Sequence, residues 1–229
     1  MRKLFLSCEH AGNKVPVNLR SLFIGAEEVL ASHRGWDIGA FGLFKALVPQ
    51  AHHFAYENLS RLCIEMNRSI VHPKLFSPYT KDAESEQRAF LLERYHAYRV
   101  DFTTAIQSSI EAGHQVLHIS VHTFTPVLDG ELRNADIGLL YDPARKQEQK
   151  FCRAWQDQLE HFLPGSKIRM NQPYRGTADG FTTALRKTFP KNYAGIEIEV
   201  NQRFAPLGVM DAKIIAGIQN SLEAVLERP

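Results

Sequence analysis

The feature that most constrains the fold is the stretch 117–126, whose sequence LHISVHTFTP is typical of a buried strand. His118, Ser120 and His122 alternate with apolar residues, and this period of two indicates a β-strand. Pro126 ends the strand. In an open α/β sheet, the carboxyl end of a strand faces the crevice in which ligands bind, so His122 is placed at a candidate site.

Strand-like and helix-like segments alternate along the rest of the chain. We predict further strands over residues 3–7, 53–57, 135–141, 167–170 and 193–201. We predict helices over residues 21–33, 83–112, 144–163, 181–188 and 210–226, and a shorter helix after Asp37. The alternation predicts a three-layer α/β/α sandwich with a mixed, mostly parallel central sheet, and we expect residues 1–229 to form a single domain.

Composition excludes several classes of protein. The 27 Lys and Arg residues nearly balance the 25 Asp and Glu residues, which argues against a nucleic-acid-binding surface. Cys8, Cys63 and Cys152 are scattered without a CxxC motif, as expected for reduced thiols. The apolar run near the N-terminus is too short for a signal peptide, and no stretch is long enough for a transmembrane helix. We therefore expect a soluble, cytoplasmic protein.

Three of the predicted strands end in residues that can bind a metal or transfer a proton. His10 follows the first strand, His122 ends the strand at 117–126, and Glu199 lies near the end of the last strand. Two imidazoles and a carboxylate with one open position form the usual ligand set of a catalytic zinc ion. A glutamate beside such an ion can act as general base on the bound water.

Arginines offer a means of binding an acidic substrate. Arg61 and Arg68 lie in irregular structure after the second strand, and the planar guanidinium group suits bidentate binding of a carboxylate. One arginine can polarise the scissile carbonyl while the other holds a substrate carboxylate. The loop 171–180 adds Arg175 and Asp179 as candidate substrate contacts. These residues together describe metal-assisted hydrolysis of an amide bond in a small acidic substrate.

Three acidic residues have more than one interpretation. Asp37 is a good N-cap for the helix that follows it, and the sequence alone favours this role over a ligand role. Glu197 and Glu199 share one face of an apolar strand, where unpaired carboxylates are costly to bury. They need a metal, an arginine or a polar cavity, unless the strand lies at a solvated edge of the sheet. The edge interpretation is stronger for Glu197 than for Glu199.

Six short segments, spread over almost the whole chain, form a recognisable set of motifs. They are SCEHAG (7–12), HRGWDIGA (33–40), the Ser-Arg and Asn-Arg pairs at 60–61 and 67–68, SVHTF (120–124), NQPYRG (171–176) and IEVN (198–201). In this order they resemble the N-formylglutamate amidohydrolase family. The resemblance implies a fold like that of zinc-dependent exopeptidases, one Zn²⁺ ion per chain, and hydrolysis of an N-acyl amino acid.

The resemblance also implies a role for most of the candidate residues. By similarity, His10 and His122 match the two histidine ligands of the zinc ion, Arg61 the carbonyl-polarising arginine, Glu199 the general base, and Asn67 with Arg68 the pair that binds a substrate carboxylate. The acidic zinc ligand departs from the pattern, because Asn13 stands where an HxxE motif would place glutamate. We take Asp37 as the third ligand, with Glu9 as the alternative. Glu65 stands where the family has aspartate, two places before Asn67, and its role is left open.

Two other functions are compatible with the sequence. A non-catalytic protein could bind an acidic metabolite in the same arginine-lined crevice, and the missing HxxE glutamate gives this alternative modest support. A cysteine hydrolase could use Cys8 beside His10, because residues two apart on a strand share a face. Turnover of an N-acyl amino acid would exclude the binding protein, and insensitivity to alkylation would exclude the cysteine hydrolase.

Overall fold

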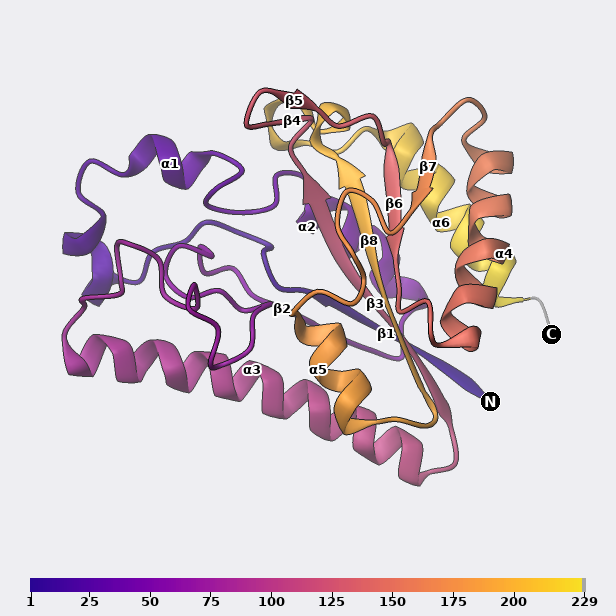
Figure 1. Cartoon of the computed structure of the whole chain (residues 1–229), viewed down its shortest axis with the longest axis horizontal. Helices are drawn as coiled ribbons and strands as arrows, with labels where there is room; N and C mark the ends of the chain where they lie inside the picture. Colours follow the sequence, from indigo (N-terminus) through magenta and orange to yellow (C-terminus); the bar gives the residue numbers. More distant parts are fainter. Residues whose placement is uncertain (228–229) are drawn as a thin grey trace.

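The computed structural model describes residues 1–227, and a six-stranded sheet forms its centre (Figure 1). The strands are β1 (Arg2–Cys8), β2 (His53–Tyr56), β3 (Gln115–Phe124), β6 (Ile137–Leu140), β7 (Ile168–Met170) and β8 (Tyr193–Asn201). Their order across the sheet is β2-β1-β3-β8-β6-β7. The first four of these strands run parallel, whereas β6 is antiparallel to β8 and parallel to β7. The predicted mixed, mostly parallel sheet is confirmed.

Helices cover both faces of the sheet (Figure 1). Those on one face are α2 (Ala40–Leu47), α4 (Lys146–Phe162) and α6 (Ala212–Leu226), and those on the other are α3 (Ser85–Glu111) and α5 (Phe181–Thr188). Successive side chains of a strand point to opposite faces, so Leu4 and Leu6 of β1 pack with the first group while Phe5 packs with the second. The predicted three-layer α/β/α sandwich is confirmed.

The longest helix, α3, joins the sheet to a lobe of irregular structure formed by residues 12–36 and 57–84, which we call the loop lobe. The C-terminal half of α3 packs on the sheet through Phe102 and Ile106. Its N-terminal half packs through Leu91 and Tyr95 on a separate apolar core, which is formed mainly by side chains of the loop lobe. The helix starts at a capping box and ends before Gly113, whose φ is +81°.

The loop lobe contains less regular structure than the sequence predicted. The predicted helix over 21–33 is wrong: the chain forms a 3₁₀ helix at Val17–Phe23 and one short helix, α1 (Glu27–Ala31). Gly25 separates them with a φ of +78°, a conformation that an α-helix does not contain. Phe23 and Ala26 still face the core of the lobe. The spacing of the apolar residues therefore indicated which side chains are buried, but not that one helix joins them.

Elements outside the lobe follow the sequence closely. The strand predicted at 193–201 and the helix predicted at 181–188 have the observed bounds. A small hairpin of β4 (Val127–Leu128) and β5 (Glu131–Leu132) follows β3, and further 3₁₀ helices span Val48–Gln50, Gln202–Phe204 and Pro206–Gly208. Within residues 1–227, every helix is too short or too polar to cross a bilayer.

Candidate metal centre

The carboxyl ends of β1, β3 and β8 meet in the middle of the sheet. The parallel register of β3 with β8 places His122 beside Glu199 and Ser120 beside Glu197. His10 follows β1 by two residues, and its ring centroid lies 5.2 Å from that of His122. The two histidines and the glutamate that the sequence placed at strand ends therefore lie together.

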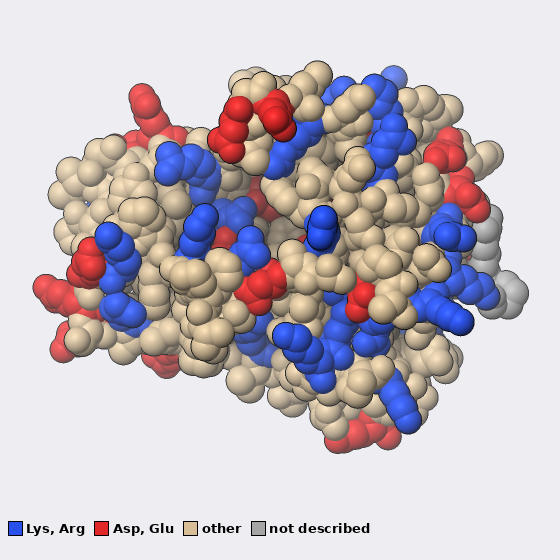
Figure 2. Space-filling view, in the orientation of Figure 1, with Lys and Arg blue, Asp and Glu red and all other residues tan. Residues whose placement is uncertain are grey.

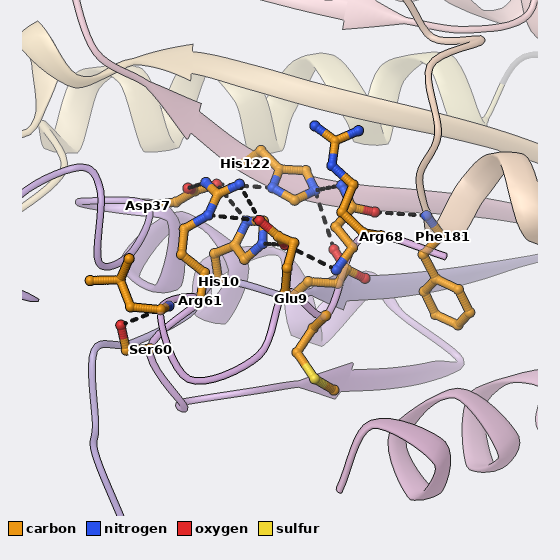
Figure 3. Close-up of polar contacts among 12 residues, drawn as sticks. Glu9, His10, Asp37, Ser60, Arg61, Arg68, His122 and Phe181 are labelled. Atoms are coloured by element: carbon orange, nitrogen blue, oxygen red, sulfur yellow. Dashed lines mark hydrogen bonds and ion pairs between the residues drawn. The ribbon is translucent and has the colours of Figure 1, made fainter. Parts of the chain in front are cut away.

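His10, Asp37 and His122 form a compact, buried cluster (Figure 3). Oδ2 of Asp37 lies 2.9 Å from Nδ1 of His122 and 3.4 Å from Nδ1 of His10. The three residues can each offer one ligand atom, and these atoms lie within 4.8 Å of one another. Nδ1 of His10 is buried and has no hydrogen-bond partner in the described part of the chain. Two imidazole nitrogens and a carboxylate oxygen arranged in this way could hold a metal ion.

Each histidine of the cluster has a carboxylate on the opposite side of its ring. Nε2 of His10 contacts Oε1 of Glu65, and Nε2 of His122 lies 3.2 Å from Oε2 of Glu9. The hydroxyl oxygen of Ser120 lies 2.8 Å from the same nitrogen of His122. Histidines that bind metals commonly have such a partner on the other nitrogen, and it fixes the orientation of the ring.

Carboxylates dominate the electrostatics of the cluster. Burial opposes a charged imidazole, but Asp37 and Glu9 outweigh it and raise the pKa of His122 well above its ordinary value. For His10, burial and the positive charge of Arg61 both oppose a charged imidazole, but Glu65 and Asp37 outweigh them and raise its pKa. The two imidazoles in turn hold the pKa of Asp37 well below its ordinary value, although burial acts against this. A potential of this sign favours a cation between the three side chains.

The expectation that Asp37 caps the following helix is wrong. Helix α2 begins at Ala40, and its N-cap is Gly39, whose φ of +86° favours glycine. The backbone N–H of Asp37 donates to the carbonyl of His10 at 3.1 Å, and its Oδ1 accepts from Nη1 of Arg61 at 3.2 Å. These contacts turn the carboxylate toward the two histidines.

Arg61 connects Asp37 to Glu65. Its Nε and Nη2 donate to Oε2 of Glu65 at 2.9 and 2.6 Å, while Nη1 reaches Asp37. Burial opposes both charges, but their attraction lowers the pKa of Glu65 and raises that of Arg61. Glu65, whose role the sequence left open, thus contacts both His10 and Arg61.

Asn67 contacts the first residue of α5, and Arg68 contacts the loop that precedes this helix. Oδ1 of Asn67 accepts from the backbone N–H of Phe181 at 2.7 Å, and Nη1 of Arg68 donates to the carbonyl of Asp179 at 2.6 Å. The carboxylate of Asp179 accepts from the backbone N–H of Ser69 at 2.9 Å. Asp179 therefore links two loops, a structural contact that its sequence context did not indicate.

A pocket of about 170 Å³ opens onto the cluster. Its lining adds Arg61, Asn67, Arg68, Thr123, Tyr174, Arg175, Ala178, Asp179, Glu197 and Glu199 to the three residues of the cluster. Figure 2 shows this face hollowed near its middle, with basic side chains around the hollow and acidic ones within it. The pocket thus combines cationic groups at its walls with carboxylates at its floor.

Glu199 lines the pocket, and the pKa of its carboxyl group lies well above the ordinary value. It is 5% exposed, and its Oε2 has no hydrogen-bond partner within residues 1–227. Burial, reinforced by the charges of Asp37 and Glu197, raises the pKa of Glu199 to about 8. A carboxyl with such a pKa can take up and release a proton near neutral pH.

The loop 171–180 is braced from beneath by residues that the sequence analysis did not single out. The buried Arg186 donates through Nη1 to the carbonyl of Gly176 at 2.6 Å and through Nε to Glu148 at 3.0 Å. Arg175 extends from this loop and is exposed, and among residues 1–227 its side chain makes no hydrogen bond or ion pair. Its guanidinium group is free to meet a ligand at the mouth of the pocket.

Cys8 lies in the apolar core between the sheet and α2, and it is fully buried. Burial, together with the charges of Glu9 and Asp37, raises the pKa of its thiol well above the ordinary value. A protonated, inaccessible thiol is unsuited to nucleophilic attack, so the structure argues against a cysteine hydrolase.

Comparisons with known proteins give both a family and a fold. Residues 2–205 match the family model described as N-formylglutamate amidohydrolase. A gene product from Agrobacterium tumefaciens has a TM-score of 0.78 at 24% identity, over 98% of this chain and 92% of that chain. The N-formylglutamate amidohydrolase from Ralstonia eutropha has a TM-score of 0.67 at 16% identity, over 97% and 90% of the two chains. No curated protein sequence matches this chain significantly. At these identities the structural matches show the shared fold.

Proposed function

Because the chain belongs to the N-formylglutamate amidohydrolase family, we propose that it is a metal-dependent hydrolase of a small N-acyl amino acid. The bond cleaved is the amide between the acyl group and the amino acid, and N-formylglutamate is the first substrate to test. The observation that carries the proposal is the cluster of His10, Asp37 and His122 beside Glu199, at the floor of an arginine-lined pocket.

The residues of the cluster suit a zinc ion. Nδ1 of His10, Nδ1 of His122 and an oxygen of Asp37 make the two-imidazole, one-carboxylate set that catalytic zinc favours, whereas magnesium and calcium prefer oxygen ligands alone. The buried Nδ1 of His10 lacks a hydrogen-bond partner among residues 1–227, as expected of an atom that serves as a ligand. A zinc ion held there would polarise the substrate carbonyl and lower the pKa of a water molecule.

Glu199 is the proposed general base. It stands next to His122 across the β3–β8 ladder, and its Oε2 is free of protein hydrogen bonds within the described residues. The ionised carboxylate accepts a proton from the attacking water at Oε2. The same atom then returns the proton to the amide nitrogen as the C–N bond breaks, so that the acid and the free amino acid leave.

The arginines of the pocket are proposed to bind the substrate. Arg61 has five N–H donors, of which three contact Glu65 and Asp37, so two remain for the carbonyl oxygen on which negative charge develops. Arg68 keeps donors beyond its bond to the loop 171–180, and we assign it, with Asn67, to a substrate carboxylate. The exposed Arg175 is placed to meet a second carboxylate.

A substrate panel and metal analysis test this proposal. Purified protein supplied with zinc is assayed for release of free amine from N-formylglutamate, N-acetylglutamate and N-formylalanine, beside His122→Ala. We expect about one zinc per chain and turnover in the wild type, and loss of both in the variant. Zinc binding without turnover on any N-acyl amino acid would instead favour a binding protein for an acidic metabolite.

A further inference from the structure

Glu9 is a buried carboxylate that forms no ion pair with a Lys or Arg side chain among residues 1–227. It is 0% exposed, and its charge is met by groups on β3 and α3. Tyr98 donates its hydroxyl to Oε1 at 3.0 Å, and Ser120 donates to Oε2 at 2.6 Å. The third neighbour is Nε2 of His122, which lies 3.2 Å from Oε2. A carboxylate is costly to bury, so its position beside this one imidazole calls for an explanation.

The hydrogen-bond partners of His122 decide which ring nitrogen keeps its proton when a metal ion binds. The hydroxyl of Ser120 has a single proton, and Glu9 receives it, so the oxygen of Ser120 can only accept from His122. A carboxylate oxygen near Nε2 also requires a proton there, because it can only accept. Asn67 could donate to Nε2, but its Nδ2 lies 3.4 Å away, farther than either oxygen. Nε2 therefore carries a proton. Oδ2 of Asp37, 2.9 Å from Nδ1, can also only accept, so Nδ1 carries a proton as well while no metal ion is bound.

The other nitrogen of the ring, Nδ1, faces the cluster. It lies 2.9 Å from Oδ2 of Asp37, on the side of the ring away from Glu9. When a metal ion binds, the proton on Nδ1 is the one that leaves, because Nε2 keeps its acceptors Glu9 and Ser120, and the lone pair of Nδ1 then faces the ion. The two nitrogens of an imidazole point away from each other, so an ion held at Nδ1 lies out of reach of Glu9.

We propose that Glu9 and Ser120 are positioning residues: they fix His122 with its proton on Nε2 and its Nδ1 toward His10 and Asp37, and they thereby set metal affinity. The inference rests on the proposed function, since its purpose is metal binding. Glu9, which the sequence analysis kept as an alternative metal ligand, thereby becomes the partner of the ligand His122 rather than a ligand itself. Ser120, which the sequence showed only as a polar residue of a strand, becomes the acceptor that orients the ring.

The test is zinc affinity, measured by competition with a chromophoric chelator on the metal-free, full-length protein. We expect Glu9→Gln and Ser120→Ala to weaken zinc binding by about 10- to 100-fold, the range seen when such outer partners are removed. Ser120→Thr keeps the hydroxyl and should restore affinity to near the wild-type value. Glu57→Gln is the matched control, because Glu57 is also a buried carboxylate and binds Arg94 and backbone amides away from the cluster.

A second readout reports the tautomer itself. In zinc-loaded protein with ¹⁵N-labelled histidine, the shifts of His122 should show a protonated Nε2, and a proton on Nδ1 would overturn the proposal. Thermal melts identify any variant that fails to fold. If Glu9→Gln does not fold, the comparison of Ser120→Ala with Ser120→Thr tests the proposal. If the wild type binds zinc and both Glu9→Gln and Ser120→Ala bind it equally well, this inference fails while the proposed function stands. If the wild type binds no zinc, both fail.

Discussion

Replacement of His118 by glutamine should flatten the dependence of stability on pH between pH 7 and pH 5. His118 lies on the same face of β3 as His122, but in the interior of the sheet, where it is fully buried. Its Nε2 lies 2.7 Å from the hydroxyl of Ser7 and its Nδ1 2.8 Å from that of Tyr193. Burial lowers the pKa of His118 from 6.5 to about 3, so the folded protein keeps this imidazole neutral.

The magnitude follows from the difference between the folded and unfolded states. Between pH 6.5 and 3 the unfolded chain binds a proton at His118 that the folded chain does not, so stability is lost as the pH falls. The slope approaches about 1.4 kcal/mol per pH unit, which amounts to about 2 kcal/mol between pH 7 and pH 5. Glutamine does not titrate, and it keeps one donor and one acceptor for the two hydroxyls.

Urea unfolding at pH 7 and pH 5 measures this difference. Both proteins are studied with a chelator, so that metal binding does not add to the free energy of unfolding. The variant is expected to be less stable at pH 7, yet to lose about 2 kcal/mol less than the wild type on going to pH 5. Equal losses in the two proteins would refute the reasoning, because other titrating groups are common to both.

Three further predictions concern the site. Glu199→Gln should lower kcat by about 10²- to 10⁴-fold while zinc affinity stays close to that of the wild type, and full activity would remove Glu199 from the mechanism. Arg175→Gln should raise KM for N-formylglutamate by about tenfold or more and leave KM for N-formylalanine unchanged, since only the former has a second carboxylate. Gly176→Ala places a Cβ 2.2 Å from the backbone nitrogen of Tyr141, so it should destabilise the fold by about 1–3 kcal/mol, seen as a lower Tm. An unchanged Tm would contradict that contact.

The alternation of residues in the strands and the order of the motifs were enough to predict most of the fold. The alternation of polar and apolar residues in the stretch 117–126 placed His118, Ser120 and His122 on one face, and the family match confirms the resemblance seen in six short segments. Alternation cannot tell a buried imidazole from one at a site, because both lie on the same face. The position of His122 at the carboxyl end of the strand singled it out, and the register with β8 supports this choice, since His118 lies opposite Gly195 and His122 opposite Glu199.

The sequence was weakest where irregular backbone sets the geometry. Asp37 follows a tight turn, and its side chain reaches the cluster because Gly39 takes over the helix cap at a positive φ. The contact of Glu65 with His10 joins residues 55 positions apart and depends on the course of the loop lobe. A pattern of hydrophobicity reports burial along a segment, but it carries no information on how two loops meet.

The central claim is that a metal ion at His10, Asp37 and His122 is required for hydrolysis. The most direct measurement is the rate of N-formylglutamate cleavage before and after removal of metal with a chelator, and again after zinc is restored. We expect activity to disappear on chelation and to return with about one equivalent of zinc in the wild type, and to stay absent in His122→Ala. Hydrolysis that survives complete removal of metal, at an unchanged rate, would contradict the account.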